Sequence, residues 1–293
     1  MQGGKAGSGR NSGRCGMKAM ALVAMLVMAD EAQAQQPSQQ PSIVSANLCA
    51  DQLVLSLADR DQIVSLSPFA ADKEISFLAA QAAGLPRNTG AAEELIRLSA
   101  DLVVLGRYDN RLTRDFLAAK ARPFAVVDSW VSLDETRREI TALAARFGHP
   151  DRGAALVAAI DESTGALAAL AGEVPQRSFL ILHRRGYVLH AGLAGDLAVK
   201  AGLRNAAGDV GLMASGFVDL ERVVAARPDY LMVAEAHDRP EDQGEALLEH
   251  PALRRLYPPE RRLVVPDLLT ICPGPAIPAL AARLAQEIKA KVR

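Results

Sequence analysis

Residues 92–105 read AEELIRLSADLVVL, and residues 219–233 read DLERVVAARPDYLMV. Each stretch predicts a short helix that opens with an acidic residue, followed by an aspartate and a buried strand. A unit that occurs twice indicates two similar lobes rather than a solenoid, which stacks three or more repeats. Clefts between domains are common sites for small ligands. The repeat therefore predicts two lobes with a ligand cleft between them.

The bulk composition fits a folded protein of this size. The chain has 293 residues, enough for two domains, of which 49% are hydrophobic and 23% are charged. The formal net charge is -1 and no basic stripe is present. This charge pattern argues against nucleic acid as a partner.

Residues 1–34 predict a signal peptide that is removed after about Ala34. They combine a basic start, an apolar run over 19–29 and a small-x-small cleavage site. The apolar run is shorter than the roughly 20 residues that span a bilayer, which disfavours an uncleaved anchor. Residues 35–41 predict a flexible lead-in. The mature chain is therefore expected in the periplasm.

The cysteines follow from this export signal. Met1 and Met17 both stay open as the start of translation, and in either case Cys15 is absent from the mature chain. Cys49 and Cys272 remain, an even pair in an oxidising compartment.

Short apolar runs and helical spacing alternate over 42–131, the predicted first lobe. Strands are expected at 42–45, 63–66, 102–105 and 124–127, with helices at 51–58, 71–83 and 111–121 besides that of the repeat. Alternating strands and helices predict a parallel sheet covered by helices on both faces.

Residues 132–174 break this rhythm and predict a bridging helix. Ser132 and Glu135 fit a capping box, and apolar residues recur at helical spacing up to Leu170. Gly148-His149-Pro150 interrupts the pattern, so one kinked helix and two abutting helices both stay possible. A continuous helix of about 39 residues would run roughly 58 Å, longer than one small domain.

Residues 175–293 return to alternation and form the predicted second lobe. Strands are expected at 178–182, 187–190 and 263–265, and helices at 195–201, 240–256 and 276–292, besides the second repeat. The predicted fold class is α/β: two lobes with parallel sheets flanked by helices, joined by the bridging helix.

Three segments then resemble one protein family. They are the opening strand and loop at 42–47, the stretch 93–104, and the glycine-rich 191–196 followed by 201–205. Taken in order, they are similar to the substrate-binding proteins of ABC importers, in the class that binds cobalamin, ferric siderophores and haem. The resemblance covers nearly all of the mature chain.

The chain also departs from that family pattern. Asp51-Gln52 stands where the family often has Thr-Glu in its first helix, and Ala100 stands where a proline usually precedes the aspartate. The opening motif commonly includes a proline, and Cys49 falls in that neighbourhood.

The resemblance implies a function and its partners. A monomeric protein would capture a small-molecule metal chelate and deliver it to an inner-membrane ABC permease dimer, with no catalysis, no resident cofactor and no bare metal site. Glu93 and Glu221 occupy the positions of the family's permease-docking glutamates, and Glu94 is a substitute for Glu93. Acids near helix starts also complement the helix dipole, which is the structural alternative.

Ligands of α/β lobes meet the loops at the carboxyl ends of strands, and those loops supply the candidate cleft residues. Aromatic rings there would stack on a planar macrocycle, and Arg107, Arg184 and Arg185 would pair with carboxylates. The candidates are Asn47, Cys49, Phe69, Arg107, Tyr108, Trp130, Arg184, Tyr187 and Cys272.

Three alternatives stay open for Cys49 and Cys272: a disulfide across the cleft, thiolates for a soft metal, and unrelated buried thiols. The competing functions are an exported enzyme, with Cys49 and His190 as nucleophile and base, and a haem or metal chaperone. The chain has no Gly-x-Ser-x-Gly, P-loop or Cys-x-x-Cys motif, which disfavours the enzyme. His190 is also a conceivable haem ligand.

Overall fold

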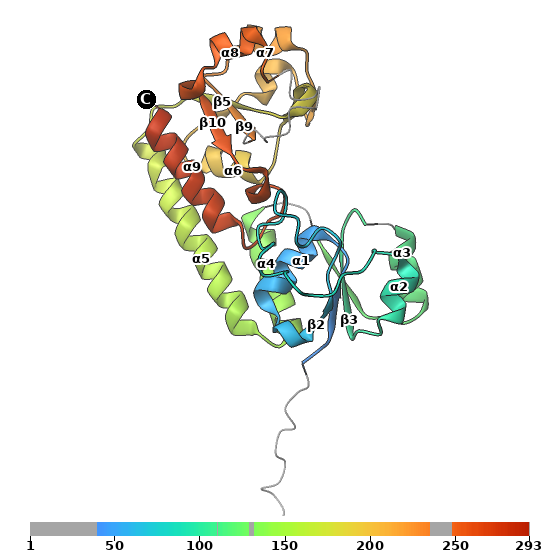
Figure 1. Ribbon diagram of the computed structural model, residues 1–293. Coiled ribbons are helices and arrows are strands. Elements are labelled where there is room, and N and C mark those ends of the chain that lie inside the picture. The colour runs from blue at the N-terminus through green and yellow to red at the C-terminus, as the bar shows by residue number, and fades with distance from the viewer. Residues whose placement is uncertain (1–39, 110, 129–131, 235–247, 293) are drawn as a thin grey trace, which may run out of the picture. The chain divides into compact units, whose positions relative to one another are not determined.

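The computed structural model describes residues 40–109, 111–128, 132–234 and 248–292 (Figure 1). The predicted signal peptide, most of the predicted lead-in and Trp130 lie outside these residues. Within them the chain is α/β, with two separate sheets, which confirms the predicted fold class. We call the first sheet with α1–α3 the first lobe, and the second sheet with α6–α9 the second lobe.

The first sheet is fully parallel, as expected, with the strand order β2-β1-β3-β4. Parallel order requires a crossover between successive strands, and short helices or turns supply it. The strands are β1 (Ile43–Ser45), β2 (Ile63–Ser65), β3 (Leu102–Gly106) and β4 (Phe124–Val127), and the helices are α1 (Leu48–Leu57), α2 (Ala92–Arg97) and α3 (Arg111–Ala119).

The second sheet is mixed, with the order β10-β9-β5-β6-β8 and β7 beside β5. The strands are β5 (Ser178–Leu182), β6 (Tyr187–Leu189), β7 (Arg204–Asn205), β8 (Gly216–Phe217), β9 (Tyr230–Ala234) and β10 (Arg262–Val265), and the helices are α6 (Leu193–Lys200), α7 (Leu220–Ala226), α8 (Pro251–Leu256) and α9 (Ile277–Lys291). The prediction of a parallel sheet is wrong for β6, which runs antiparallel to β5 and β8. The short turn at 183–186 reverses the chain directly, too short a link for a parallel crossover.

The predicted bridging segment forms two helices, α4 (Leu133–Phe147) and α5 (Pro150–Ala168), and not one continuous helix. Gly148 adopts a left-handed conformation at φ 85° and ends α4, while Pro150 occupies the first turn of α5. The helices then pack on each other so closely that a Cβ atom on Gly153 would lie 2.5 Å from that of Ala144. This close packing requires glycine at position 153.

Helix α5 links the two lobes. It packs along both α4 and α9, which lie on the same side of α5 in Figure 1. One hydrophobic cluster includes Ile43 of β1, Ile160 of α5 and Phe179 of β5, so the two lobes share apolar core. Among the described residues, Pro150–Gly172 is long and apolar enough to cross a membrane, a property that core helices of soluble proteins share.

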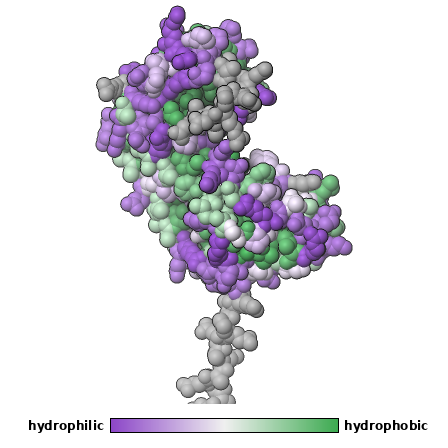
Figure 2. Space-filling model, viewed as in Figure 1, coloured by the Kyte–Doolittle hydropathy of each residue, from purple (hydrophilic) through white to green (hydrophobic). Residues whose placement is uncertain are grey.

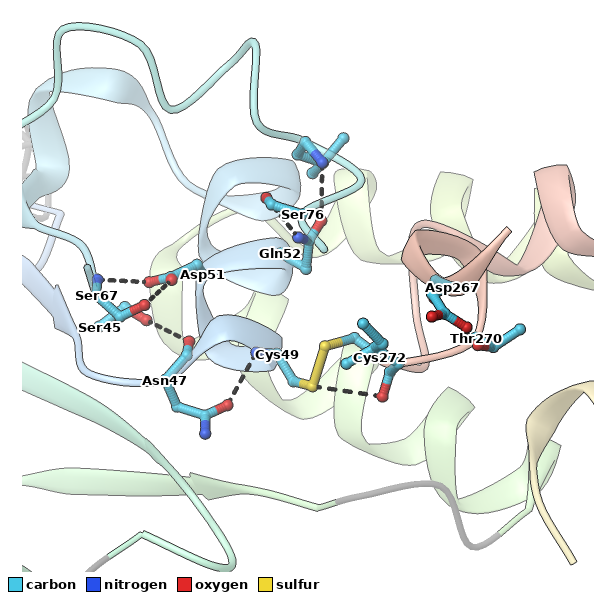
Figure 3. Close-up of a disulfide and its surroundings, with 12 residues drawn as sticks. Ser45, Asn47, Cys49, Asp51, Gln52, Ser67, Ser76, Asp267, Thr270 and Cys272 are labelled. Carbon is cyan, nitrogen blue, oxygen red and sulfur yellow. Dashed lines mark hydrogen bonds between the residues drawn. A yellow bond between two sulfur atoms is a disulfide. The ribbon is translucent and has the colours of Figure 1, made fainter. Parts of the chain in front are cut away.

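The predicted helix over 71–83 is wrong, because this segment forms a series of turns. The buried side chain of Gln52, on α1, replaces helical hydrogen bonds there. Its amide nitrogen donates to Ser76 Oγ at 2.9 Å, and its oxygen accepts from Leu78 N at 3.1 Å (Figure 3). Ser76 Oγ in turn donates to the carbonyl of Ala70 at 2.7 Å. Contacts distant in sequence therefore override the local helical spacing.

Asp51, the neighbour of Gln52, pins the start of the same segment. Its fully buried carboxylate accepts hydrogen bonds from the backbone nitrogen and the hydroxyl of Ser67 (Figure 3). Burial raises the pKa of Asp51 to about 6, against the opposing effect of the hydrogen bonds from Ser45 and Ser67. The unusual Asp51-Gln52 pair thus holds the loop that follows β2.

The aspartate of each sequence repeat is a clamp between two strands. Asp101 accepts from the backbone nitrogen and the hydroxyl of Ser42 at 2.8 and 2.7 Å, which joins the starts of β1 and β3. Asp229 accepts from the same two groups of Ser178 at 2.8 Å each, which joins β5 and β9. In both cases the serine hydroxyl also accepts from the backbone nitrogen of the aspartate at 3.0 Å.

The repeat also has the same turn in both lobes. Ser99 and Arg227, each two residues before the aspartate, have left-handed backbones at φ 52° and 45°. A residue of this conformation ends a helix and turns the chain toward the strand. The two-lobe prediction from the repeat therefore extends to hydrogen bonds and backbone geometry.

We expect Asp229→Ala to lower the free energy of unfolding by about 1–3 kcal/mol, because hydrogen bonds to a charged group are lost. Burial acts to raise the pKa of Asp229, but the hydrogen bonds from Ser178 and the charges of Arg177 and Arg261 outweigh it, so the pKa is lowered. Its contribution is complete above the unfolded pKa of about 4 and is lost as the pH falls through the folded value. Urea unfolding of wild type and variant at neutral and acidic pH measures this difference. An equal loss in the exposed control Glu260→Ala, or none in Asp229→Ala, would contradict the clamp.

For Asp51 we expect the opposite pH dependence of the free energy of unfolding. Since its folded pKa of about 6 lies above the unfolded value, its buried charge destabilises the protein as the pH rises from about 4 to 6. The shift of about two pKa units corresponds to about 3 kcal/mol. The side chain in Asp51→Asn stays neutral. The free energy of unfolding of this variant should therefore rise relative to that of wild type as the pH increases across this range. Urea titrations measure the free energy of unfolding of both proteins against pH. If the wild-type and Asp51→Asn profiles run parallel, the buried charge of Asp51 does not destabilise the protein.

Candidate functional site

A cavity of about 260 Å³ opens at the carboxyl ends of β5, β9 and β10 in the second lobe. This edge is where parallel α/β sheets bind ligands, because the strands end there and the loops diverge. Its lining comes from the ends of the three strands, from the residues between β6 and α6, and from the loop after β10. Apolar groups dominate it, among them Ile181, Leu189, Met232, Val265 and Ile271.

The turn between β6 and α6 closes one side of the cavity. Ala191 is exposed at its mouth, while Leu193 and Ala194 lie buried at the start of α6. The turn is held by His190, whose backbone nitrogen donates to Ser215 Oγ at 3.0 Å and whose carbonyl accepts from Asn205 at 2.9 Å. The cavity wall is therefore fixed by hydrogen bonds and does not depend on a ligand for its form.

Close packing brings α6 against the sheet beside the cavity. A Cβ atom at Gly195 would lie 2.9 Å from Ile181 Cδ1, so a larger residue here would have to displace the end of that side chain. The backbone N–H groups at the start of α6 carry partial positive charge. The glycine-rich stretch 191–196 thus shapes the cavity wall, in the segment that carries the family resemblance.

His183 and Asp267 supply the polar groups of the cavity. His183 follows β5 directly, and Asp267 follows β10. Burial lowers the pKa of His183, against the charge of Asp267, so the imidazole is neutral near pH 7 and keeps a free nitrogen lone pair. The sequence interpretation missed both residues. Their position after strands of a parallel sheet was the signal that could have found them.

The arginine turn at 184–186 lies beside His183. Arg184 and Arg185 are exposed, and Arg185 has a left-handed backbone at φ 60°, uncommon for a residue with a side chain. Tyr187 follows and meets Phe217 of β8 edge to face, with ring centroids 5.0 Å apart. The predicted residues Arg184 and Tyr187 are therefore close to the cavity in sequence and strand position, though they do not line it.

The predicted residues of the first lobe have different surroundings. Asn47 caps α1: its side chain accepts from Cys49 N at 2.8 Å and donates to Asp109 at 3.0 Å. Its amide group therefore caps α1 and links the loop after β1 to the loop after β3. Phe69 is 53% exposed in the turn after β2.

Arg107 and Tyr108 follow β3. Arg107 forms an ion pair with Asp128, and Tyr108 is 83% exposed. The ring of Tyr108 and the guanidinium of Arg107 are both accessible to solvent, and neither residue lines the second-lobe cavity. Trp130 lies outside the described part of the chain.

Cys49 and Cys272 form a disulfide in the structure, with sulfur atoms 2.08 Å and Cα atoms 5.1 Å apart (Figure 3). Of the three alternatives left open by the sequence, the structure has the cross-link. Cys49 lies in the first turn of α1, and Cys272 lies buried in the loop between β10 and α9. The bond therefore joins the first lobe to the second.

Glu93 and Glu221 occupy equivalent places in the two lobes. Each is exposed in the first turn of its helix, α2 or α7. Glu94 is engaged differently, since it accepts from Thr89 N at 2.7 Å and from the Thr89 hydroxyl. These hydrogen bonds lower the pKa of Glu94. Glu93 is thus exposed to solvent, whereas Glu94, its proposed substitute, is hydrogen-bonded to Thr89.

A group of three or more histidine, cysteine, aspartate or glutamate side chains able to hold a metal ion is absent from the described residues. The side chain of His190 lies half-buried beside the cavity turn and outside the cavity lining. His183 is thus the histidine that the structure places in the cavity.

Solved structures with the same fold are numerous. Among them are the apo periplasmic heme-binding protein RhuT from Roseiflexus sp. RS-1 (24% identity, 85% of this chain and 99% of that chain, TM-score 0.67) and an ABC-type Fe3+-hydroxamate transport system protein from Saccharomonospora viridis (22%, 86% and 94%, 0.64). A third is the periplasmic vitamin B12 binding protein BtuF of Vibrio cholerae (16%, 85% and 97%, 0.63).

At these identities the likeness shows the fold alone. No curated protein matches the chain by sequence. A family model described as periplasmic binding protein matches residues 43–258, which include the first sheet, α5, the cavity turn and all of the second sheet except β10. The chain therefore belongs to the periplasmic binding protein family.

Proposed function

We propose that this protein is an exported, monomeric substrate-binding protein that captures a metal chelate in the periplasm and delivers it to an inner-membrane ABC permease. The observation that carries the proposal is the apolar cavity at the carboxyl ends of β5, β9 and β10, with a neutral imidazole in its wall. The chelate is a corrinoid, a ferric siderophore or haem. Membership of the periplasmic binding protein family supports this class, as do the heme, Fe3+-hydroxamate and vitamin B12 named for the similar solved structures.

The size of the cavity limits what it holds. At about 260 Å³ it is slightly smaller than typical ligand pockets, which enclose about 300–1,000 Å³. It suits one edge or substituent of a chelate, with the rest of the ligand lying outside. The arginine turn and the Tyr187–Phe217 pair are next along the same strand ends and offer charge and aromatic surface.

The disulfide argues against two alternative functions. A bonded Cys49 is not a free thiol, so it cannot serve as a nucleophile with His190. For the same reason the pair supplies no thiolates to a soft metal while the bond is intact. Family members with known ligands are binding proteins, which agrees with capture and release of an unchanged ligand.

Docking to the permease completes the proposed function. Glu93 and Glu221 would each meet a cationic residue of one permease subunit, because matching acids on two lobes fit a two-fold partner. Figure 2 shows mainly hydrophilic residues over α7 and α8, the surface around Glu221. Charges at the rim of an interface mainly steer encounter and fix orientation.

We expect Ala191→Phe to fill the mouth of the cavity and weaken chelate binding by at least about tenfold. Ala191 is exposed, so the larger side chain should leave the melting temperature unchanged. Haemin, cyanocobalamin and ferrichrome are titrated with the mature protein by native mass spectrometry and calorimetry. The matched control is Ala118→Phe, exposed on α3 of the other lobe.

One of the three probes should form a stoichiometric complex with wild type and with Ala118→Phe. If none of the probes binds at micromolar concentration, the proposed chelate function is wrong. If a probe binds Ala191→Phe as tightly as wild type, the ligand site lies elsewhere.

Another prediction of the proposed function concerns transport. Glu93→Lys with Glu221→Lys should lower ligand-stimulated ATP hydrolysis by the reconstituted permease at least about tenfold, because two contacts turn repulsive. The dissociation constant of the ligand should not change, since neither acid lines the cavity. Glu260→Lys, an exposed acid of the second lobe, serves as the charge-matched control. Unaltered stimulation in the double variant would exclude these glutamates from docking.

A further inference from the structure

We propose that the Cys49–Cys272 disulfide positions the ligand cavity, by holding one wall of it against the first lobe. We call this link, with the loop 267–276 that it secures, the clasp. The cysteines act here as positioning residues, since they hold Thr270 and Ile271 and do not themselves line the cavity. The effect on ligand binding rests on the proposed function, whereas the effect on the loop does not.

The first-lobe end of the clasp is rigid. Cys49 lies on α1, whose residues Leu48, Ala50 and Leu53 are buried in the core. Its backbone nitrogen donates to the capping side chain of Asn47, which also binds Asp109. Asp109 in turn accepts from the backbone nitrogen of Gly106 at 2.6 Å. Cys49 is thus fixed to the end of β3 through a chain of hydrogen bonds.

The second-lobe end is held mostly by local bonds. In the 3-10 turn η7 (Asp267–Leu269) and just after it, Thr270 N and Ile271 N both donate to the carbonyl of Asp267, at 2.8 and 3.2 Å. Ile277 N donates to Gly274 at 3.0 Å. Within the described residues, the backbone hydrogen bonds of this loop therefore close inside the loop. They give the loop its shape, and the buried Leu269 anchors its start in the core, but the hydrogen bonds do not fix where Thr270 and Ile271 lie relative to the first lobe.

The covalent bond supplies that fixed place. It joins residues 223 positions apart in the chain, and the Sγ atom of Cys49 also lies 3.8 Å from the carbonyl oxygen of Ile271. Asp267, Thr270 and Ile271 line the cavity, and Cys272 comes directly after them (Figure 3). The other lining residues belong to strands, to the residue directly after β5, or to α6 and the hydrogen-bonded turn before it. Thr270 and Ile271 are therefore the part of the wall whose position depends on the first lobe.

Gly274 adds a second contact to the clasp. It has a left-handed backbone at φ 113°, and a Cβ atom there would lie 3.0 Å from Cδ2 of Leu53 on α1. This left-handed backbone favours glycine, and a larger residue would also press on the end of the Leu53 side chain. Replacing Gly274 disturbs the seating of the loop on α1 without removing a cysteine, which gives an independent way to loosen the clasp.

The ligand-free test is hydrogen–deuterium exchange of the loop. In Cys49→Ser/Cys272→Ser, exchange of the Thr270 and Ile271 amides should speed up by at least about tenfold relative to wild type. Any cross-link also stabilises the whole protein, so the control is Leu117→Ala, which removes a buried side chain from the α2–α3 side of the first lobe and keeps the disulfide. Exchange in the loop that rises no more in the serine variant than in this control would overturn the proposal.

The ligand readout separates positioning from stability. The chelate probe that binds wild type should bind the serine variant at least about tenfold more weakly, while Leu117→Ala retains wild-type affinity. Gly274→Ala should give the same two effects with the disulfide present, and it decides the question if the serine variant does not fold. Unchanged loop exchange and affinity in Gly274→Ala would contradict the proposal. If no probe binds wild type, the proposed function fails, and the exchange experiment still decides whether the clasp holds the loop.

Discussion

Each lobe depends on one charged hydrogen-bond pair, an aspartate that clamps a serine at the start of the neighbouring strand. Asp101 and Ser42 join β1 to β3, and Asp229 and Ser178 join β5 to β9. Because the clamp sets the amino ends of two parallel strands, it also sets where their carboxyl ends lie. In the second lobe those ends present His183 and Met232 to one cavity. The same residue pattern that reveals the repeat thus fixes the site at the opposite edge of the sheet.

The two lobes are connected both by packing and by a covalent bond. Helix α5 packs along α9 and contributes to a core shared by both sheets, while the disulfide joins α1 to the loop after β10. These links have different consequences. The core contacts stabilise the fold as a whole, whereas the disulfide ends at the cavity wall. A change at Cys49, in the first lobe, is therefore expected to alter the affinity for a ligand bound in the second lobe.

Local sequence patterns predicted the elements whose cause is local. Apolar runs gave the strands of both repeats, and Gly148 and Pro150 marked the break between α4 and α5. The turns at 71–83 could not be predicted, because the hydrogen bonds of Gln52 that replace the helix come from α1. The antiparallel direction of β6 depends on its pairing partners, which periodicity does not reveal. His183 was missed since its burial beside Asp267 arises only when β5 and β10 share a sheet. The cysteine pair was found, but its bonding required geometry.

The central claim is that the ligand occupies the cavity at the carboxyl ends of β5, β9 and β10. Anomalous X-ray diffraction from crystals of the mature protein with its chelate tests this most directly, because iron or cobalt is then located without reference to the fold. The account predicts a single anomalous peak beside the cavity mouth, next to His183 and Ala191. A peak bound only to residues of the first lobe, or crystals that hold no metal after saturation with every chelate class, would contradict it.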